Sequence, residues 1–247
     1  MFSNEFRVLF GKEWKQAVRN RGAVLTAVLF PVLFLLVVPG AQAFAASQGI
    51  ATSNLTATNL PPGLTDVSPK AIFTQMMFPM FLVIGGLVVP SVAASYTVVS
   101  EREKRTIDLL TALPVSLGQV IGAKLAAISA LGILITLPLA LIDCALLLVL
   151  GLADPLLISG YLFELFAALL FSVASAMATA LFAKDFRSSN NISGLFMGPM
   201  IVLTLGFGLL LPWGLYRLFL HGALLVALGI GILFVALKTV SVERFAL

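Results

Sequence analysis

Charged side chains are scarce in this sequence, and their scarcity limits the classes of protein it can belong to. There are 15 basic and 11 acidic residues in 247, whereas 60% of the residues are hydrophobic. Soluble domains carry about 25% charged residues. A chain of 26.2 kDa that folded as one soluble domain could not bury this much apolar surface. The composition therefore excludes a soluble enzyme and a disordered chain.

Cysteine and histidine are also nearly absent, with one of each, Cys144 and His221. A single cysteine cannot form an internal disulfide, which excludes a disulfide scaffold. One cysteine and one histidine are too few soft ligands for a His/Cys metal site, so no resident metal is expected. The sequence also lacks a Gly-x-x-x-x-Gly-Lys-Ser/Thr motif, and with it a cradle for nucleotide phosphates.

Long apolar runs are what the sequence has in abundance. A bilayer core of about 30 Å needs about 20 apolar residues per helix, and six segments reach that length. We therefore predict an all-α integral membrane protein, one transmembrane domain over residues 1–247. The predicted spans are 23–46, 72–96, 119–143, 160–183, 192–211 and 218–237.

The sequence predicts irregular helices at two places. The apolar stretch 119–150 is too long for one straight span, so we expect its helix to fade between Asp143 and Leu150 and to kink at Pro138. Glycines and Pro212 interrupt the stretch 205–221, which leaves open a short re-entrant or interfacial helix there.

The basic residues set the expected orientation. Of the 15, 13 lie in or beside the N-terminal stretch, the second and fourth connections and the C-terminal end, whereas Lys70 and Arg217 lie on the other side. Both termini are therefore predicted to be cytoplasmic. Basic residues that follow membrane topology do not form one groove, which excludes nucleic acid. A cleaved signal peptide is disfavoured because the first apolar run has 24 residues and 22 precede it.

Residues 1–22 are predicted to form an amphipathic helix. Helical spacing places aromatic side chains on one side and basic side chains around the rest, and such a helix lies in the headgroup layer. It can serve as a topology anchor or as a lever between the first span and a moving partner, and the two roles are compatible. The residues that define this interfacial helix are Phe6, Phe10, Trp14, Lys12, Lys15 and Arg19.

A charged run followed by leucines stands between the second and third spans. Six of the eight residues from Glu101 to Asp108 are charged, with net charge zero, and opposite charges four residues apart support a helix. Leucines give this helix an apolar side, and Pro114 ends it. A topogenic loop needs only basic residues, whereas exposed apolar side chains rimmed by charge indicate docking to a protein. A solvated helix on the bilayer surface is the alternative.

The same run carries a family resemblance. It leads into Thr106-Ile-Asp-Leu-Leu110, then Leu113-Pro-Val-Ser116 and Gly122-Ala-Lys124. This order resembles the signature of ABC-type-2 transporter permeases, in which T-I/L-E/D-x-L-L is followed by P-V-S and Gly-x-Lys. The segments 12–15, 19–21 and 30–31 resemble the entry helix and first span of drug- and sodium-efflux members. The connection over residues 47–70 is much shorter than the external domain that some efflux permeases carry.

The resemblance implies a transmembrane subunit of an ATP-driven ABC exporter. It implies two copies, as a homodimer or related heterodimer, in the plasma membrane of a prokaryote. Each copy would sit on a separate ATP-binding subunit, which would bind ATP and Mg and hydrolyse the nucleotide, so this chain is not expected to be an enzyme. Residues 101–115 would form the coupling helix that docks in that subunit, through Glu101, Arg102, Glu103, Lys104, Arg105, Thr106, Ile107, Asp108, Leu109 and Leu110.

Alternatives from other classes stay open. The exporter would work by alternating access on a hydrophobic or amphiphilic substrate. A secondary transporter, or an ion or drug efflux protein without an ATPase partner, would need inverted repeats, and none is evident. An intramembrane enzyme would need converging catalytic groups. A passive scaffold fits if the charged helix docks something other than an ATPase.

Polar residues within the spans are the candidate substrate or ion contacts. Asp143 lies in an apolar run and is the strongest of them, with snorkelling to the interface as the alternative. Glu164 fits a partner for the N-terminal dipole of the fourth span, and Asp154, before Pro155, fits a turn. Close helix packing or a polar strip along the transport path explains the hydroxyl residues Ser91, Ser95, Ser172, Ser175 and Thr179.

Overall fold

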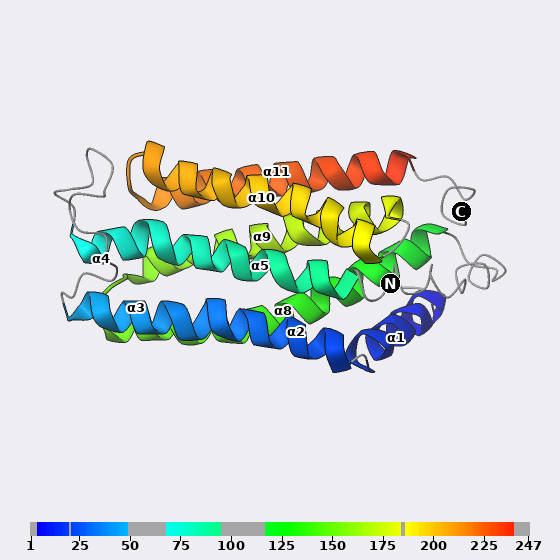
Figure 1. The fold of residues 1–247 in the computed structure, drawn as a ribbon, viewed down its shortest axis with the longest axis horizontal. Helices are drawn as coiled ribbons and strands as arrows, with labels where there is room; N and C mark the ends of the chain where they lie inside the picture. Colours follow the sequence, from blue (N-terminus) through cyan, green and yellow to red (C-terminus); the bar gives the residue numbers. More distant parts are fainter. Residues whose placement is uncertain (1–3, 20, 49–67, 95–116, 184–185, 240–247) are drawn as a thin grey trace.

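The structure, a computed structural model, describes residues 4–19, 21–48, 68–94, 117–183 and 186–239, and every regular element in them is a helix. Helix α1 (Asn4–Arg19) lies at one end of a long bundle, at an angle to the other helices (Figure 1). We call this the α1 end. The opposite end, where α4 (Pro69–Ile72) lies, is called the far end.

The bundle is formed by six long helical stretches. The first joins α2 (Arg21–Val32), the π-helical turn η1 (Leu33–Val37) and α3 (Val38–Ser47). The second joins α4, the π-helical turn η3 (Phe73–Met77) and α5 (Phe78–Ala94). The others are α8 (Leu117–Val149), α9 (Pro155–Phe182), α10 (Phe186–Leu210) and α11 (Leu215–Thr239).

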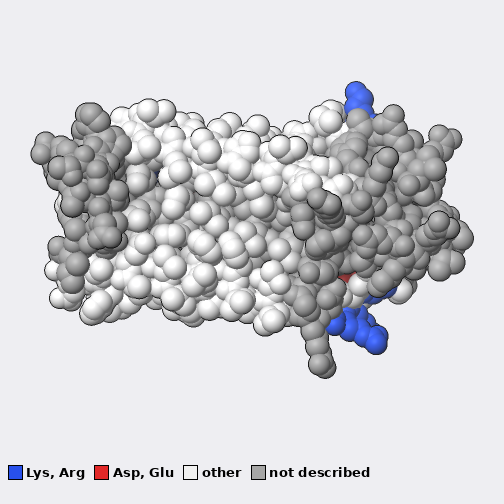
Figure 2. Space-filling view, in the orientation of Figure 1, with Lys and Arg blue, Asp and Glu red and all other residues white. Residues whose placement is uncertain are grey.

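Each of these stretches contains a segment long and apolar enough to cross a membrane, which gives six within the described residues: Val24–Ser47, Lys70–Ala94, Gly118–Val149, Pro155–Thr179, Asn191–Leu210 and Leu215–Ala236. The predicted number of spans is confirmed, and most boundaries agree within a few residues. In the space-filling view, blue Lys and Arg side chains gather at the α1 end, and the long middle part is white (Figure 2). Which side of the membrane the α1 end faces stays a prediction.

The third span differs from the prediction. Helix α8 continues without a break to Val149, six residues past Asp143, with Pro138 inside it. The helix passes the predicted span end at Asp143 and stops within the stretch 143–150 where it was expected to fade, because an isolated acid does not stop a helix whose next turn is apolar and packed. Leu147 of that added stretch is buried among core side chains. Asp143 accordingly lies within the span and not at its end.

The fourth span starts earlier than predicted because Asp154 caps it. The Asp154 carboxylate accepts a hydrogen bond of 2.6 Å from the Leu157 N–H, and Pro155 occupies the first turn. This confirms Asp154 as a turn residue. Residues 211–214 form a short irregular link between α10 and α11. The re-entrant helix considered for that region is absent from it.

Two spans contain a π-helical turn placed just before a proline. In η1 the Val38 N–H bonds to the Leu33 carbonyl, five residues back, and Pro39 follows. In η3 the Phe78 N–H bonds to the Phe73 carbonyl in the same way, and Pro79 follows. Proline has no N–H and crowds the preceding turn, so a widened turn absorbs the disruption. Such π turns often accompany functional sites.

Spans α5 and α9 form the centre of the bundle. About 61% and 56% of their most apolar stretches are buried, against 17% for α10. Phe73 and Phe78 pack with Tyr161 and Leu165 in one buried apolar cluster. A Cβ on Gly86 would lie 3.0 Å from the Ala168 Cβ, so only glycine allows α5 and α9 to approach this closely.

Candidate functional site

The predicted coupling helix lies outside the described residues. This holds for all of residues 101–115 and also for Ser95. The elements that flank it are described, because α5 ends at Ala94 and α8 begins at Leu117. The candidate site at this end must therefore be built from α8 and from the helix that packs on its first turns.

A buried ion pair joins α1 to α8. Lys124 Nζ lies 2.7 Å from Glu13 Oε2, and the two side chains are 0% and 2% exposed. Lys12 lies on the outer side of the same carboxylate, with its Nζ 3.1 Å from Glu13 Oε1. Gln119 Nε2 donates to Glu5 Oε2 across the same two helices at 3.1 Å. Removing one partner from a buried pair strands the other charge, so the pair fixes α1 on α8.

Apolar contacts complete the α1–α8 junction. Leu9 packs with Val120 and Ala123, and Phe6 lies against this cluster. Residues 4–19 of the predicted stretch 1–22 are helical. The buried side of this helix includes Glu13, which the predicted amphipathic pattern does not contain. Two signals in the sequence identify this pair. One is a lysine at the start of an apolar span, and the other is a glutamate on the apolar side of a helix.

The interfacial residues fall into two groups. Phe6, Phe10 and Trp14 are half-buried, and the rings of the last two stack with centroids 6.3 Å apart. Lys12, Lys15 and Arg19 are exposed. The position of this helix in the headgroup layer stays a prediction.

At the far end, a polar cluster connects three spans. Glu164 of α9 pairs with His221 of α11 through Glu164 Oε1 and His221 Nδ1, and both side chains are 2% exposed. His221 Nε2 lies 3.4 Å from Thr204 Oγ1 of α10. Thr204 donates its one hydroxyl proton to the Met200 carbonyl at 2.7 Å, so it can only accept from the imidazole.

Two further groups line this cluster. Arg217 Nη1 donates to the Gly208 carbonyl at 3.2 Å. Gln75, in the η3 turn, lines the same small hollow as Glu164 and His221. Glu164 Oε2 and Gln75 Oε1 are both buried without a hydrogen-bond partner among the described residues. The hollow has a volume of about 10 Å³, enough for one water molecule that could bridge such oxygens.

The role predicted for Glu164 is corrected by this geometry. Because Asp154 starts α9 at Pro155, Glu164 lies almost three turns into the helix and cannot act as a partner of its N-terminal dipole. Its partner is instead His221, 57 residues later in the chain. Gln75, Thr204 and Arg217 were not among the predicted site residues, because no local pattern relates positions on four different elements.

Asp143 occupies a different place from the Glu164 cluster. Its side chain is 2% exposed on α8 and faces α3, where Oδ1 lies 3.8 Å from the position of a Cβ built on Gly40. Neither carboxylate oxygen has a hydrogen-bond partner within the described part of the chain. Snorkelling to the interface does not describe this buried side chain. Its role as a cation or substrate contact stays a prediction.

The hydroxyl residues mainly connect helices. Ser172 Oγ donates to the Leu87 carbonyl of α5 at 2.5 Å, and Ser91 Oγ lies 2.5 Å from Ser193 Oγ of α10. Ser175 bonds to the carbonyl one turn back in its own helix. Thr179 is buried, and its hydroxyl has no hydrogen-bond partner among described residues. These bonds favour the packing interpretation over a polar strip along a transport path.

Comparison with known proteins identifies the family. The model of a family described as "ABC-2 family transporter protein" matches residues 7–222. No curated protein matches the chain. Since the match covers most of the chain, the protein belongs to the ABC-2 transporter family, and with its six apolar helices it is a multi-pass transmembrane permease. Among described residues, no three of the types His, Cys, Asp and Glu lie together as a metal site would require.

Proposed function

We propose that this ABC-2 family chain is the transmembrane subunit of an ATP-driven exporter that works by alternating access with a separate ATP-binding subunit. The observation that carries the proposal is the α1–α8 junction. The expected coupling helix, 101–115, immediately precedes α8 in the chain. A displacement of that helix would therefore reach α8 directly and α1 through the buried Glu13–Lys124 pair.

The far-end cluster fits the other half of an alternating-access cycle. It ties α9, α10 and α11 together at the end opposite the expected ATPase. In this proposal the cluster closes the external end while the α1 end is engaged. The substrate class, a hydrophobic or amphiphilic compound, rests on the resemblance alone.

A second copy is proposed to pack on α10. This span is the least buried of the six, and its Leu195 and Val202 are 74% and 68% exposed. Gly194 and Gly198 lie four residues apart, and a Cβ on either would have no neighbour within 4 Å. Small residues at this spacing allow two helices to pack closely in a membrane.

Co-purification tests the ATPase partnership. The solubilised full-length chain should retain an ATP-binding subunit, and Leu109→Ala/Leu110→Ala should lose it. Leu209→Ala/Leu210→Ala is the matched control, since both of its leucines are exposed at the far end. Equal retention by the two double variants would refute docking through residues 101–115. Failure of the wild-type chain to retain such a subunit would favour the secondary transporter.

Cysteine cross-linking tests the second copy. Leu195→Cys on α10 should form a disulfide between copies in the membrane, whereas Phe234→Cys on α11, 66% exposed, should not. The native Cys144 is buried, so it does not compete. Cross-linking at residue 234 but not at 195 would place the interface elsewhere.

A further inference from the structure

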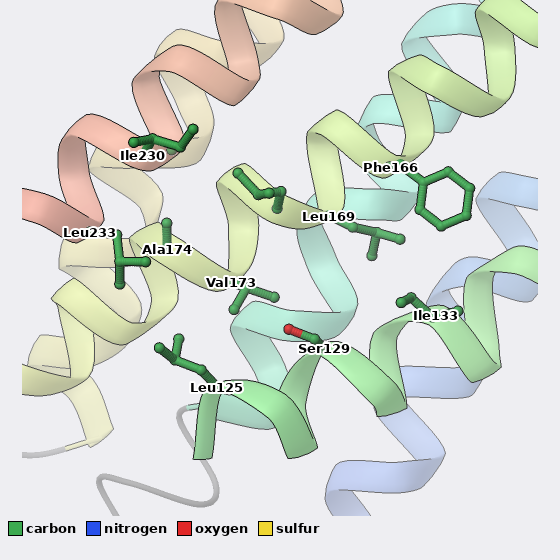
Figure 3. A pocket seen from close by; sticks show the side chains of 11 residues that line it. Leu125, Ser129, Ile133, Phe166, Leu169, Val173, Ala174, Ile230 and Leu233 are labelled. Carbon is green, nitrogen blue, oxygen red and sulfur yellow. The ribbon is translucent and has the colours of Figure 1, made fainter. Parts of the chain in front are cut away.

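An apolar groove between α8, α9 and α11 is separate from the α1–α8 junction and from the far-end cluster. Its volume is about 400 Å³. Leu125, Ser129 and Ile133 of α8 lie on one side of it, Ile230 and Leu233 of α11 lie on the other, and α9 runs between them (Figure 3). Of its described lining residues, Ser129 alone has a polar side chain.

Small residues create this groove. A Cβ on Gly229 would lie 3.0 Å from the Phe171 Cα, so α11 packs directly on the backbone of α9. Ser129 and Ala174 add little volume on the facing helices. The helices therefore stay close, while their small side chains leave the groove open along α9.

The surroundings of the groove decide what can fill it. Leu169 and Val173 of its floor are buried, whereas Phe166, Leu170 and Ile230 of its rim are 43%, 43% and 57% exposed. All these residues lie inside membrane-crossing stretches, so the rim faces hydrocarbon. An unfilled apolar groove of this size would forfeit dispersion contacts along its walls. An acyl chain is the one long apolar group that the bilayer itself supplies at this depth.

The α1 end of the groove indicates where the headgroup would lie. Leu125 packs with Trp14 and Ala17 of α1 as well as lining the groove, and Lys15 is exposed on that helix. From Leu125 the lining residues of α8 run two turns into the span, to Ile133. The groove thus starts beside a basic helix and ends in the middle of the hydrocarbon.

We propose that this groove binds one acyl chain of a bilayer phospholipid, with the headgroup toward α1. The proposal does not depend on the proposed transport function. A bound chain would fill the space between α8 and α11 and would set their separation. The α10 face proposed for a second copy is not part of the groove, so pairing of copies there would leave it open.

Photolabelling tests the site directly. The full-length chain is placed in nanodiscs containing phosphatidylglycerol with a diazirine midway along one acyl chain, and labelled residues are mapped by mass spectrometry. Labelling at Phe166, Leu170 and Ile230 should be several-fold higher than at Leu29 and Phe234, which are more exposed but lie outside the groove. Equal labelling of both sets would show ordinary lipid contact and overturn the proposal.

Filling variants provide the control. Ser129→Leu should lower labelling in the groove, whereas Ala145→Leu, on the exposed face of the same helix, should not. Leu233→Phe fills the groove from α11 if Ser129→Leu does not fold. Undiminished labelling in a folded filling variant, or a cross-link from the groove to a second copy, would overturn the site. A diazirine next to the headgroup should label near Leu125, and labelling near Phe166 instead would reverse the assigned direction.

Discussion

The two ends of the bundle each contain a buried acid–base pair, but the pairs differ in what happens when one partner is removed. At the α1 end, Glu13 faces Lys124, whose ammonium is a compact charge. At the far end, Glu164 pairs with His221, whose ring also lies against Thr204 of α10. A neutral imidazole needs no countercharge, whereas a buried ammonium does. Substitution of one partner should therefore lower the free energy of unfolding more at the α1 end than at the far end.

The largest expected effect is at the α1 end. Glu13→Gln leaves Lys124 buried opposite a neutral amide and should lower the free energy of unfolding by about 3–5 kcal/mol. The double variant Glu13→Gln/Lys124→Met should recover part of this loss, because it removes the buried ammonium together with the carboxylate that faces it. Unfolding of the purified chain in detergent, followed by heat or denaturant, measures both. Glu5→Gln is the control, since Glu5 is exposed, and an equal loss there would contradict the comparison.

Substitution in the far-end pair should lower the free energy of unfolding by a smaller amount. Glu164→Gln removes a charged partner of His221 but keeps an acceptor for it, and we expect a loss of about 2 kcal/mol. Tyr216→Phe, which removes an exposed hydroxyl bonded to the Pro212 carbonyl on the same side of the bundle, should change little. The same unfolding experiment compares them. A loss at Glu164 larger than that at Glu13 would reverse the ranking of the two ends.

The cap of α9 should contribute less again. Asp154→Ala removes the acceptor for the Leu157 N–H and should cost about 1 kcal/mol. Asp154→Asn keeps an acceptor oxygen and should retain most of the stability. If both variants lose stability equally, the side chain does not act as a cap.

The smallest effect is expected between the two ends. Ser91 and Ser193 form one hydrogen bond between α5 and α10, and interhelical bonds of this kind average about 0.6 kcal/mol in membranes. Ser91→Ala, Ser193→Ala and the double variant form a cycle that isolates the coupling. If the coupling energy between Ser91 and Ser193 equalled that between Glu13 and Lys124, the polar pairs at the ends would not contribute more to stability than this pair between them.

Local patterns anticipated much of the fold but little of the far-end cluster. The six spans were predictable because about 20 apolar residues are needed wherever a helix crosses a bilayer. The Asp154–Pro155 pair also identified a turn. The Glu164–His221 pair was missed because its members are 57 residues apart. The first assignment of Glu164 relied on the position of a helix start, and a shift of five residues was enough to make it wrong.

The sequence by itself determined that this is a six-span permease, because apolar run length is a local property and the family match covers most of the chain. Tertiary structure alone decided which sparse polar residues meet. It places Glu13 against Lys124, brings the residues of the far-end cluster together from four elements and leaves an apolar groove beside Gly229. The physical reason is that helix packing, set by glycines and by π turns before prolines, fixes which faces touch.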